Sequence, residues 1–238
     1  MRVLLLSLLM LACSGVSGLS PAAYAATSVA NQRHIILCGG PALRKWENYR
    51  VQRDQHDRWW ANFVRASTLR MDEIRRAYGN EAPITWLVYR AGYAARGRED
   101  GKPYTTWLTE LAAKRKVTLV WVNDGTEVIN AINRHPSNSV MTFDFFGHSN
   151  KHCFLLDYSG QIIGASKAWI HENDLARIRR GVFARNAQCQ SWGCHTGESM
   201  SAFWKRATGH SMLGARGKTN YEAVGQGRMP TVSGSWVR

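Results

Sequence analysis

Two short segments of the chain each combine a reactive side chain with glycine. Residues 143–149 read Phe-Asp-Phe-Phe-Gly-His-Ser and contain His148, whereas residues 191–197 read Ser-Trp-Gly-Cys-His-Thr-Gly and contain Cys194. A thiol attacks as the thiolate, and a nearby imidazole lowers the pKa that controls its ionisation. If the two segments end neighbouring strands, we expect His148 to act as general base and acid while Cys194 attacks an acyl carbon.

The elements that must position these residues alternate along the chain. Apolar runs predict strands, and helical spacing of apolar residues predicts helices between them. This alternation predicts an α/β fold, a three-layer sandwich with a mostly parallel sheet flanked by helices. The strands are expected at 34–38, 84–89, 117–122, 139–146, 187–193 and 211–215, and the helices at 54–78, 105–114, 173–182, 198–207 and after a cap at Thr126.

The segments between these elements are expected to be irregular. Residues 90–104 contain glycine and many polar residues, so we expect a loop there, and residues 153–158 are expected to form a hairpin arm. The glycine-rich segment after residue 215 is expected to be loop and terminal extension. Sites in such folds lie at the carboxyl ends of strands, where both His148 and Cys194 are expected.

Neighbouring residues suggest how this site would work. Backbone N–H groups of Ser149 and Cys194 are candidates for stabilising an oxyanion, helped by the positive end of the helix near Glu198. The glycines at 147, 193 and 197 would allow tight turns and a close approach of substrate. Trp192 is expected to line the cleft with Gly147 and Gly193, and His195 is expected to support the loop.

The two segments also resemble the caspase-like cysteine peptidases, especially the metacaspases. The resemblance is carried by Phe-x-Phe-x-Gly-His at residues 143–148 and Cys-His-Thr-Gly at residues 194–197, where metacaspases have Cys-His-Ser-Gly. It covers roughly residues 33–220 and is weak outside the two motifs. It implies a caspase-like fold, a His148/Cys194 dyad, a peptide or protein substrate and no cofactor. The order of histidine before cysteine also argues against a papain-like enzyme.

Two positions depart from the metacaspase pattern. Ser149 stands where these enzymes usually have glycine, and Trp192 stands where they have an acidic residue that binds a basic P1 side chain. Cleavage after lysine or arginine is therefore not implied, and neither is activation by calcium. A preference for aspartate would need basic residues in the cleft, for which Arg44 and Arg216 are candidates.

Two alternatives compete with the peptidase hypothesis. One is a caspase-like protein of the envelope that binds a partner without catalysis, because fold alone does not imply activity. The other is a zinc-binding protein, although the spacing of the ligands matches no common structural zinc pattern. Its candidate ligands are His148, His152, Cys153, Cys189, Cys194 and His195.

The N-terminus predicts export. Residues 1–25 have a short positive start, an apolar run and the small-x-small sequence Ala23-Tyr24-Ala25, which together predict a signal peptide cleaved after Ala25. Lipid attachment at Cys13 is the alternative, but residues 10–12 fit the usual lipobox poorly. Residues 26–238 then form one periplasmic or secreted domain without a membrane helix.

Charge and cysteine content suggest partners and redox state. The formal net charge of +14 favours contact with anionic partners such as envelope polymers. Nucleic acid is disfavoured, because no recognised binding motif accompanies the basic and aromatic residues. Export permits disulfides, so Cys38, Cys153 and Cys189 would supply at most one, with Cys153–Cys189 one conceivable pair.

Overall fold

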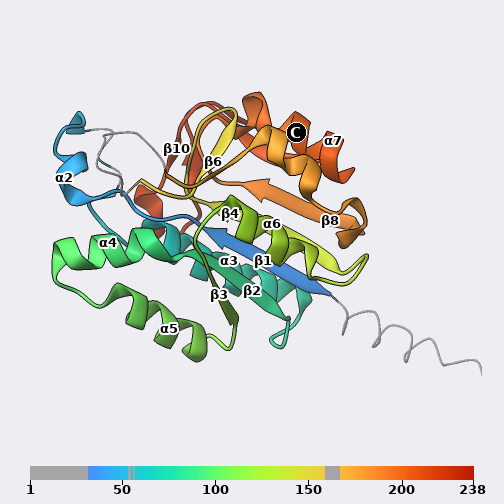
Figure 1. Ribbon diagram of the computed structural model, residues 1–238, viewed down its shortest axis with the longest axis horizontal. Coiled ribbons are helices and arrows are strands. Elements are labelled where there is room, and N and C mark those ends of the chain that lie inside the picture. Colours follow the sequence, from blue (N-terminus) through green and yellow to red (C-terminus); the bar gives the residue numbers. More distant parts are fainter. Residues whose placement is uncertain (1–31, 53–54, 56, 159–166) are drawn as a thin grey trace, which may run out of the picture. The chain divides into compact units, whose positions relative to one another are not determined.

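A seven-stranded sheet forms the centre of the molecule. The computed structural model describes residues 32–52, 55, 57–158 and 167–238 (Figure 1). The strands lie in the order β12-β9-β8-β4-β1-β2-β3, and every neighbouring pair is parallel except β12 with β9. Their bounds are Arg33–Cys38 (β1), Ile84–Tyr89 (β2), Thr118–Val122 (β3), Val140–Phe146 (β4), Phe183–Ser191 (β8), Met212–Arg216 (β9) and Ser235–Val237 (β12). The predicted signal peptide and Cys13 lie outside the described residues.

Helices bury both faces of this sheet, which explains why its central strands are almost continuously apolar. On one face, Ile35 and Leu37 of β1 pack with α6 (Gly125–Asn133), α7 (Met200–Thr208) and the 3-10 turn η2 (Glu172–Arg177). On the other face, Ile36 and Cys38 pack with α3 (Asn62–Tyr78), α4 (Arg90–Asp100) and α5 (Tyr104–Lys114). The predicted three-layer α/β sandwich is confirmed.

The strand order reverses between β1 and β4. From β1 the chain builds outward through β2 and β3, then returns to place β4 on the other side of β1. Open α/β sheets bind ligands in the crevice at such a reversal, outside the carboxyl ends of the strands. β4 pairs directly with β8, with Phe145 opposite Ser191, so the segments that follow these strands leave the sheet side by side.

The prediction of a loop at residues 90–104 is wrong, because residues 90–100 form α4. Its glycines permit close packing instead of turns. A Cβ on Gly92 would lie 2.8 Å from the Cα of Gly40, and one on Gly97 would lie 2.6 Å from the carbonyl oxygen of Lys102. The helix also buries Tyr93 and Arg96. The polar and glycine content of these residues predicted a loop, although they form a helix with one buried face.

Several helix boundaries differ from the prediction. α3 begins at Asn62 and not near residue 54, and Asp54, the expected cap, lies outside the described residues. α6 is capped by Asp124, whose Oδ1 accepts the N–H of Glu127 at 2.8 Å, in place of Thr126. α7 ends as expected at Gly209, which adopts a left-handed conformation with φ of 84°.

Residues 172–182 form two short 3-10 turns, η2 and η3 (Arg180–Val182), where one helix was predicted. Ile178 and Arg179 are extended between them, and the exposed Gly181 disfavours a continuous helix. Leu175, Ile178 and Val182 are nevertheless buried, as predicted. The apolar spacing therefore identified the buried positions, although not the type of helix that presents them.

The C-terminal segment is more regular than predicted. β12 adds an antiparallel edge strand to the sheet, while β10 (Thr219–Asn220) pairs with β11 (Thr231–Val232) and η5 (Glu222–Gln226) lies between them in sequence. A second small sheet joins β5 (His148–Ser149), β6 (Cys153–Leu155) and β7 (Trp169–His171). Residues 153–155 thus belong to a sheet arm, as expected, and the turn predicted at 159–160 lies outside the described residues.

The described cysteines Cys38, Cys153, Cys189 and Cys194 are all free thiols, so the conceivable Cys153–Cys189 disulfide is not formed. None of the helices in the described part of the chain is both long and apolar enough to cross a membrane.

Candidate active site

His148 and Cys194 line the same cleft at the carboxyl ends of β4 and β8. The cleft has a volume of about 420 Å³. His148 follows β4 through Gly147, and Cys194 lies in the turn just beyond β8. The remaining side chains that line it come from separate segments: Arg50, Val51, Ser149, Tyr158, His195 and Lys218.

A buried carboxylate holds the ring of His148. Its Nε2 lies 2.5 Å from Oδ2 of Asp57, and that carboxylate also accepts the N–H of Ala42 at 2.7 Å. A carboxylate can only accept, so Nε2 carries the hydrogen in the neutral ring and Nδ1 is left as the basic nitrogen. Nδ1 has no hydrogen-bond partner among the described residues.

Aromatic rings fix the orientation of the same imidazole. Phe63 meets it edge-on with centroids 5.1 Å apart, and Tyr158 stacks against it at 4.3 Å. The guanidinium of Arg50 lies 5.1 Å from the Tyr158 ring centroid. His148 is therefore held by both packing and hydrogen bonding, although 15% of its side chain remains exposed to the cleft.

The pKa of Asp57 reflects this pairing. Complete burial would raise the pKa of the carboxyl group, but the charge and hydrogen bond of His148 outweigh it and lower the pKa below its ordinary value. The N–H of Ala42 and the charge of Arg50 act in the same direction. Asp57 is therefore an anion at neutral pH and stabilises a positive charge on His148.

Asp57 belongs to residues 41–61, which connect β1 to α3, and Figure 1 shows that residues 41–52 run past the end of β1 and form α2 (Arg44–Glu47). Arg96 of α4 fastens both ends of this segment. Its fully buried guanidinium donates to the carbonyl oxygens of Ala42 and Asp57, both at 2.8 Å, and of Arg58 at 2.9 Å.

A second buried carboxylate supports the same segment. Oε2 of Glu47 accepts the N–H of Asp57 at 3.0 Å, while Oε1 pairs with Arg50 at 3.0 Å. Burial and the neighbouring charge of Asp57 raise the pKa of Glu47. The backbone of Asp57 is thus held by Glu47 at its N–H and by Arg96 at its carbonyl oxygen. The position of its carboxylate therefore depends on both contacts.

Two groups of Thr219 contact the sulfur of Cys194. Its Sγ lies 3.3 Å from Oγ1 of Thr219 and accepts the backbone N–H of Thr219, also at 3.3 Å. The backbone N–H of Cys194 has no acceptor among the described residues, which leaves it available for the oxyanion role predicted from the sequence.

Ser149 and His195 stabilise the turn that carries Cys194. Oγ of Ser149 donates to the carbonyl oxygen of Cys194 at 2.7 Å. His195 adopts a left-handed conformation with φ of 62°, and its Nδ1 lies 2.6 Å from Oε1 of Glu198. The supporting role expected for His195 is thus observed, and the backbone oxyanion role of Ser149 stays a prediction.

The helix after the cysteine lies farther along the chain than predicted. α7 begins at Met200 after a separate 3-10 turn, η4 (Thr196–Glu198), and the N–H of Met200 donates to the carbonyl oxygen of Lys151. The immediate environment of the sulfur is therefore set by Thr219, which comes from β10, and not by a helix beginning directly after the cysteine.

Trp192 does not line the cleft. Its ring is buried, stacks with Phe146 at 5.7 Å, and donates through Nε1 to Oδ1 of Asp144 at 3.0 Å. The apolar partners on both sides draw it into the core, which corrects the prediction that it contacts substrate.

The predicted roles of Gly147 and Gly193 are also wrong. Neither residue lines the cleft, and each has another protein group where a side chain would begin. A Cβ on Gly147 would lie 2.7 Å from Cζ of Phe145, and one on Gly193 would lie 2.2 Å from Oγ of Ser149. Gly193 therefore lets the two site segments pack against one another, and Gly147 leaves room for the Phe145 ring of its own segment.

The basic residues of the cleft are not those proposed from the sequence. Arg216 is exposed at the end of β9, opposite Ser235, and does not line the cleft. Arg44 pairs with Asp100 at 2.9 Å and is likewise outside the cleft. Arg50 and Lys218 line it instead, because the segment 41–61 and the chain after β9 fold over the strand ends.

The residues offered as zinc ligands are dispersed. Cys189 is buried in the hydrophobic core, and Cys153 lies in β6 opposite His171. Within the described residues, no group of three or more histidine, cysteine or acidic side chains is arranged to hold a metal ion.

Sequence reasoning missed Asp57, Thr219 and the residues that hold them. Asp57 carries no motif, and the sequence placed it inside a helix at 54–78; it reaches His148 because α3 begins only at Asn62 and Arg96 holds the carbonyl oxygen of Asp57. Thr219 lies in a region expected to be loop. The one available signal was the acidic residue Asp57 beside the aromatic pair at 59–60, which predicts a buried or partly buried segment.

Comparison of the chain with protein-family models, curated proteins and solved structures finds no match to any of them. What the site does must therefore be argued from its own geometry.

Proposed function

We propose that the protein is a cysteine hydrolase of the peptidase type, in which Cys194 is the nucleophile and His148 is the general base and acid. The observation that carries this proposal is that both side chains line one cleft while a buried Asp57 holds the far nitrogen of the imidazole. Nucleophile, base and orienting carboxylate are the three parts that acyl transfer by a thiol requires.

The proposed reaction has two halves. Nδ1 of His148 takes the proton of the Cys194 thiol, and the sulfur forms a bond to the substrate carbonyl carbon. The imidazolium, stabilised by Asp57, then gives its proton to the leaving amine nitrogen as the carbon–nitrogen bond breaks and leaves a thioester. Water attacks this thioester with His148 again as base, which releases the acid and restores the thiol.

Other groups of the cleft have supporting roles in this proposal. The N–H of Cys194 points to the oxyanion of the tetrahedral intermediate, and Thr219 stabilises the thiolate before attack. Arg50 and Lys218 give the cleft a cationic rim, which favours substrates with acidic or neutral side chains near the cleaved bond.

Alkylation of the four described cysteines tests the proposed nucleophile within a single molecule. Burial raises the pKa of Cys38 and Cys189 to about 12, and burial with the nearby Glu172 and Asp174 raises the pKa of Cys153. These three thiols are built-in controls. We expect iodoacetamide to modify Cys194 first at pH 6–7, as mapped by peptide mass spectrometry, and His148→Ala to slow that modification alone.

The same preparations should be tested for hydrolysis of a fluorogenic peptide library, with Cys194→Ala as the inactive control. Selective alkylation without turnover would favour the non-catalytic binding protein. Equal alkylation of Cys153 and Cys194, only at alkaline pH, would contradict an activated nucleophile. One tightly bound zinc per chain, measured in the purified protein, would contradict the peptidase proposal and support the alternative.

The proposal includes export, as the sequence of residues 1–25 predicts. N-terminal sequencing of protein recovered from a bacterial periplasm or culture medium tests it. A start at Ala26 is expected, whereas lipid-linked protein starting at Cys13 would support the alternative processing route.

A further inference from the structure

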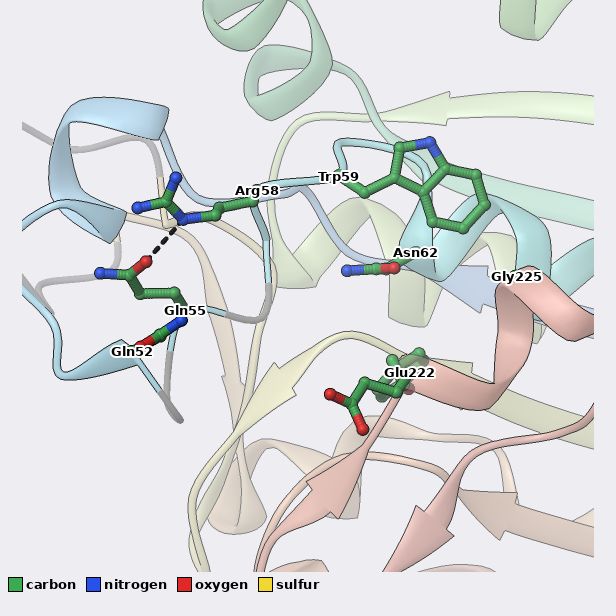
Figure 2. A pocket seen from close by; sticks show the side chains of 8 residues that line it. Gln52, Gln55, Arg58, Trp59, Asn62, Glu222 and Gly225 are labelled. Carbon is green, nitrogen blue, oxygen red and sulfur yellow. Dashed lines mark hydrogen bonds between the residues drawn. The ribbon is translucent and has the colours of Figure 1, made fainter.

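A second cavity lies beside the cleft and contains neither His148 nor Cys194. Its volume is about 310 Å³. Figure 2 shows Gln52, Gln55 and Arg58 on one side of it and Trp59, Asn62 and Glu222 on the other. Val51 lines the cleft and the next residue, Gln52, lines this cavity, so the two sites share a wall. The proposed reaction does not use any of these six side chains.

The charge of the cavity differs from that of the molecule. The whole chain carries a formal net charge of +14, yet among the described residues that line this cavity the charged ones are one arginine, Arg58, and one glutamate, Glu222. The other polar side chains of its wall include three neutral carboxamides, those of Gln52, Gln55 and Asn62. This balance disfavours phosphate and other polyanions, which would instead require a surplus of arginine and lysine.

The polar groups of the cavity supply donors and acceptors together. Carboxamides both donate and accept, a guanidinium only donates and a carboxylate only accepts. Two of these groups are already oriented: Arg58 Nε donates to Gln55 Oε1 at 2.5 Å, and Gln55 Nε2 donates to the carbonyl oxygen of Arg50 at 2.9 Å. A ligand rich in hydroxyl groups, each a donor and an acceptor, matches such a wall.

Trp59 adds an apolar surface to the same cavity. Its side chain is 43% exposed and makes no ring contact with another described aromatic residue. Its neighbour Trp60, by contrast, stacks on Tyr104 with centroids 3.9 Å apart. A large indole that is exposed beside a polar cavity leaves its apolar surface in contact with water unless a ligand covers it.

The elements that border the cavity distinguish between two kinds of neutral polar ligand, an extended peptide and a ring that carries hydroxyl groups. An extended peptide would normally pair with an open strand edge, through a repeating ladder of backbone hydrogen bonds. This cavity is instead bordered by the side chains of residues 52, 55, 58 and 59, the start of α3 and the 3-10 turn η5. A ring with hydroxyls at its rim and C–H groups on its faces suits one indole and several carboxamides.

We propose that this cavity binds a saccharide unit of a neutral oligosaccharide. The apolar face of the sugar ring packs on Trp59, and its hydroxyls bond to Gln52, Asn62 and Glu222. Because the cavity shares the segment that carries Asp57, the bound saccharide lies next to the cleft and places whatever is attached to it near Cys194. The saccharide site does not depend on catalysis by Cys194.

Titration with chitotriose and cellotriose, followed by calorimetry and by tryptophan fluorescence, tests the proposal. We expect saturable binding of at least one trisaccharide with a dissociation constant of about 1 mM or tighter. Trp59→Ala should weaken it by about tenfold or more, because the apolar surface is lost. Trp107→Ala is the matched control, since Trp107 in α5 is 41% exposed and does not line the cavity.

Two further variants separate this proposal from the proposed hydrolase. Cys194→Ala should bind the sugar as the unaltered protein does, even if the hydrolase proposal fails. Gln52→Ala should weaken binding while leaving the thermal unfolding temperature unchanged, which keeps the test valid if Trp59→Ala folds poorly. The proposal is overturned if neither trisaccharide binds below about 10 mM, if the two tryptophan variants bind equally, or if a neutral tripeptide binds more tightly than both sugars.

Discussion

Two polar clusters in this protein contain the same kinds of side chain and differ in how they are connected. In the core beneath α3, Asp144 pairs with Arg70 at 2.9 Å, and His34 bonds to Thr142 at 3.1 Å. In the cleft, Asp57 pairs directly with His148, and Arg50 pairs with Glu47.

The pKa shifts of the two clusters show what this difference does. Burial raises the pKa of Asp144 despite the charge of Arg70, and burial followed by the charge of Arg70 lowers the pKa of His34 to about 4. The pKa of Asp57 is lowered by His148. Burial and the neighbouring arginine keep His34 neutral, whereas the carboxylate of Asp57 holds His148 where its ring faces the cleft.

The largest expected effect comes from breaking the cleft pair. Asp57→Asn should lower the rate of Cys194 alkylation at pH 7, and of any hydrolysis, by about 10³-fold, because an amide does not stabilise the imidazolium or fix its tautomer. A time course of alkylation, quenched at intervals and quantified by mass spectrometry, measures the rate. Asp72→Asn, a change on the exposed side of α3, is the control, and equal rates for the two variants would contradict the proposed role.

The equivalent substitution in the core should act on stability instead. Asp144→Asn removes the fully buried partner of the largely buried Arg70 and leaves it only Glu73 as a counter-charge, so the free energy of unfolding should fall by about 3 kcal/mol. Urea unfolding measures that loss, and alkylation is then compared for equal amounts of folded protein. A loss of reactivity as large as that of Asp57→Asn, with stability retained, would show that the two clusters do not differ as described.

Arg96 offers a third test, because it positions Asp57 without touching His148. Arg96→Met should slow alkylation of Cys194 by about tenfold to a hundredfold, through displacement of the segment 41–61. Arg98→Met, on the exposed face of the same helix, should have no effect. The double variant Asp57→Asn/Arg96→Met should be no slower than Asp57→Asn alone, and full additivity would show that Arg96 acts by another route.

The smallest effect should be a change in the pH dependence of stability caused by His34. Its pKa is about 4 in the folded protein and about 6.5 when unfolded, so the unfolded chain binds more protons between these values. The stability that the neutral ring contributes is complete above pH 6.5 and is lost as the pH falls toward 4. Urea unfolding at pH 7 and pH 5 should therefore show a loss about 2 kcal/mol larger in the unaltered protein than in His34→Gln.

The sequence predicted those parts of the fold that local pattern determines. The apolar runs at β1, β2 and β4 and the spacing of Val128, Ile129 and Ile132 predicted the sandwich, and the glycine-flanked His148 and Cys194 marked two adjacent strand ends. Each of these signals arises from burial or from residues close together in the chain.

The parts that were missed depend on residues far apart in sequence. Gly92 and Gly97 predicted a loop because nothing local shows that α4 packs closely on Gly40. Trp192 was predicted to line the cleft, but its contacts with Asp144 and Phe146 place it in the core. Asp57 could not be found at all, because its partner lies 91 residues away and its segment is fastened by a buried arginine.

The hydrogen bonds of Cys194 also determine when this site can exist. The sulfur depends on Thr219, 25 residues farther along the chain, and β9 is completed by β12 only near the C-terminus. During synthesis, the histidine and its carboxylate are therefore made well before the thiol, and the thiol before the residue that donates to it. Until Thr219 has been made and β10 has folded, the sulfur of Cys194 lacks the N–H that donates to it, so any reactivity that depends on this hydrogen bond appears late in folding.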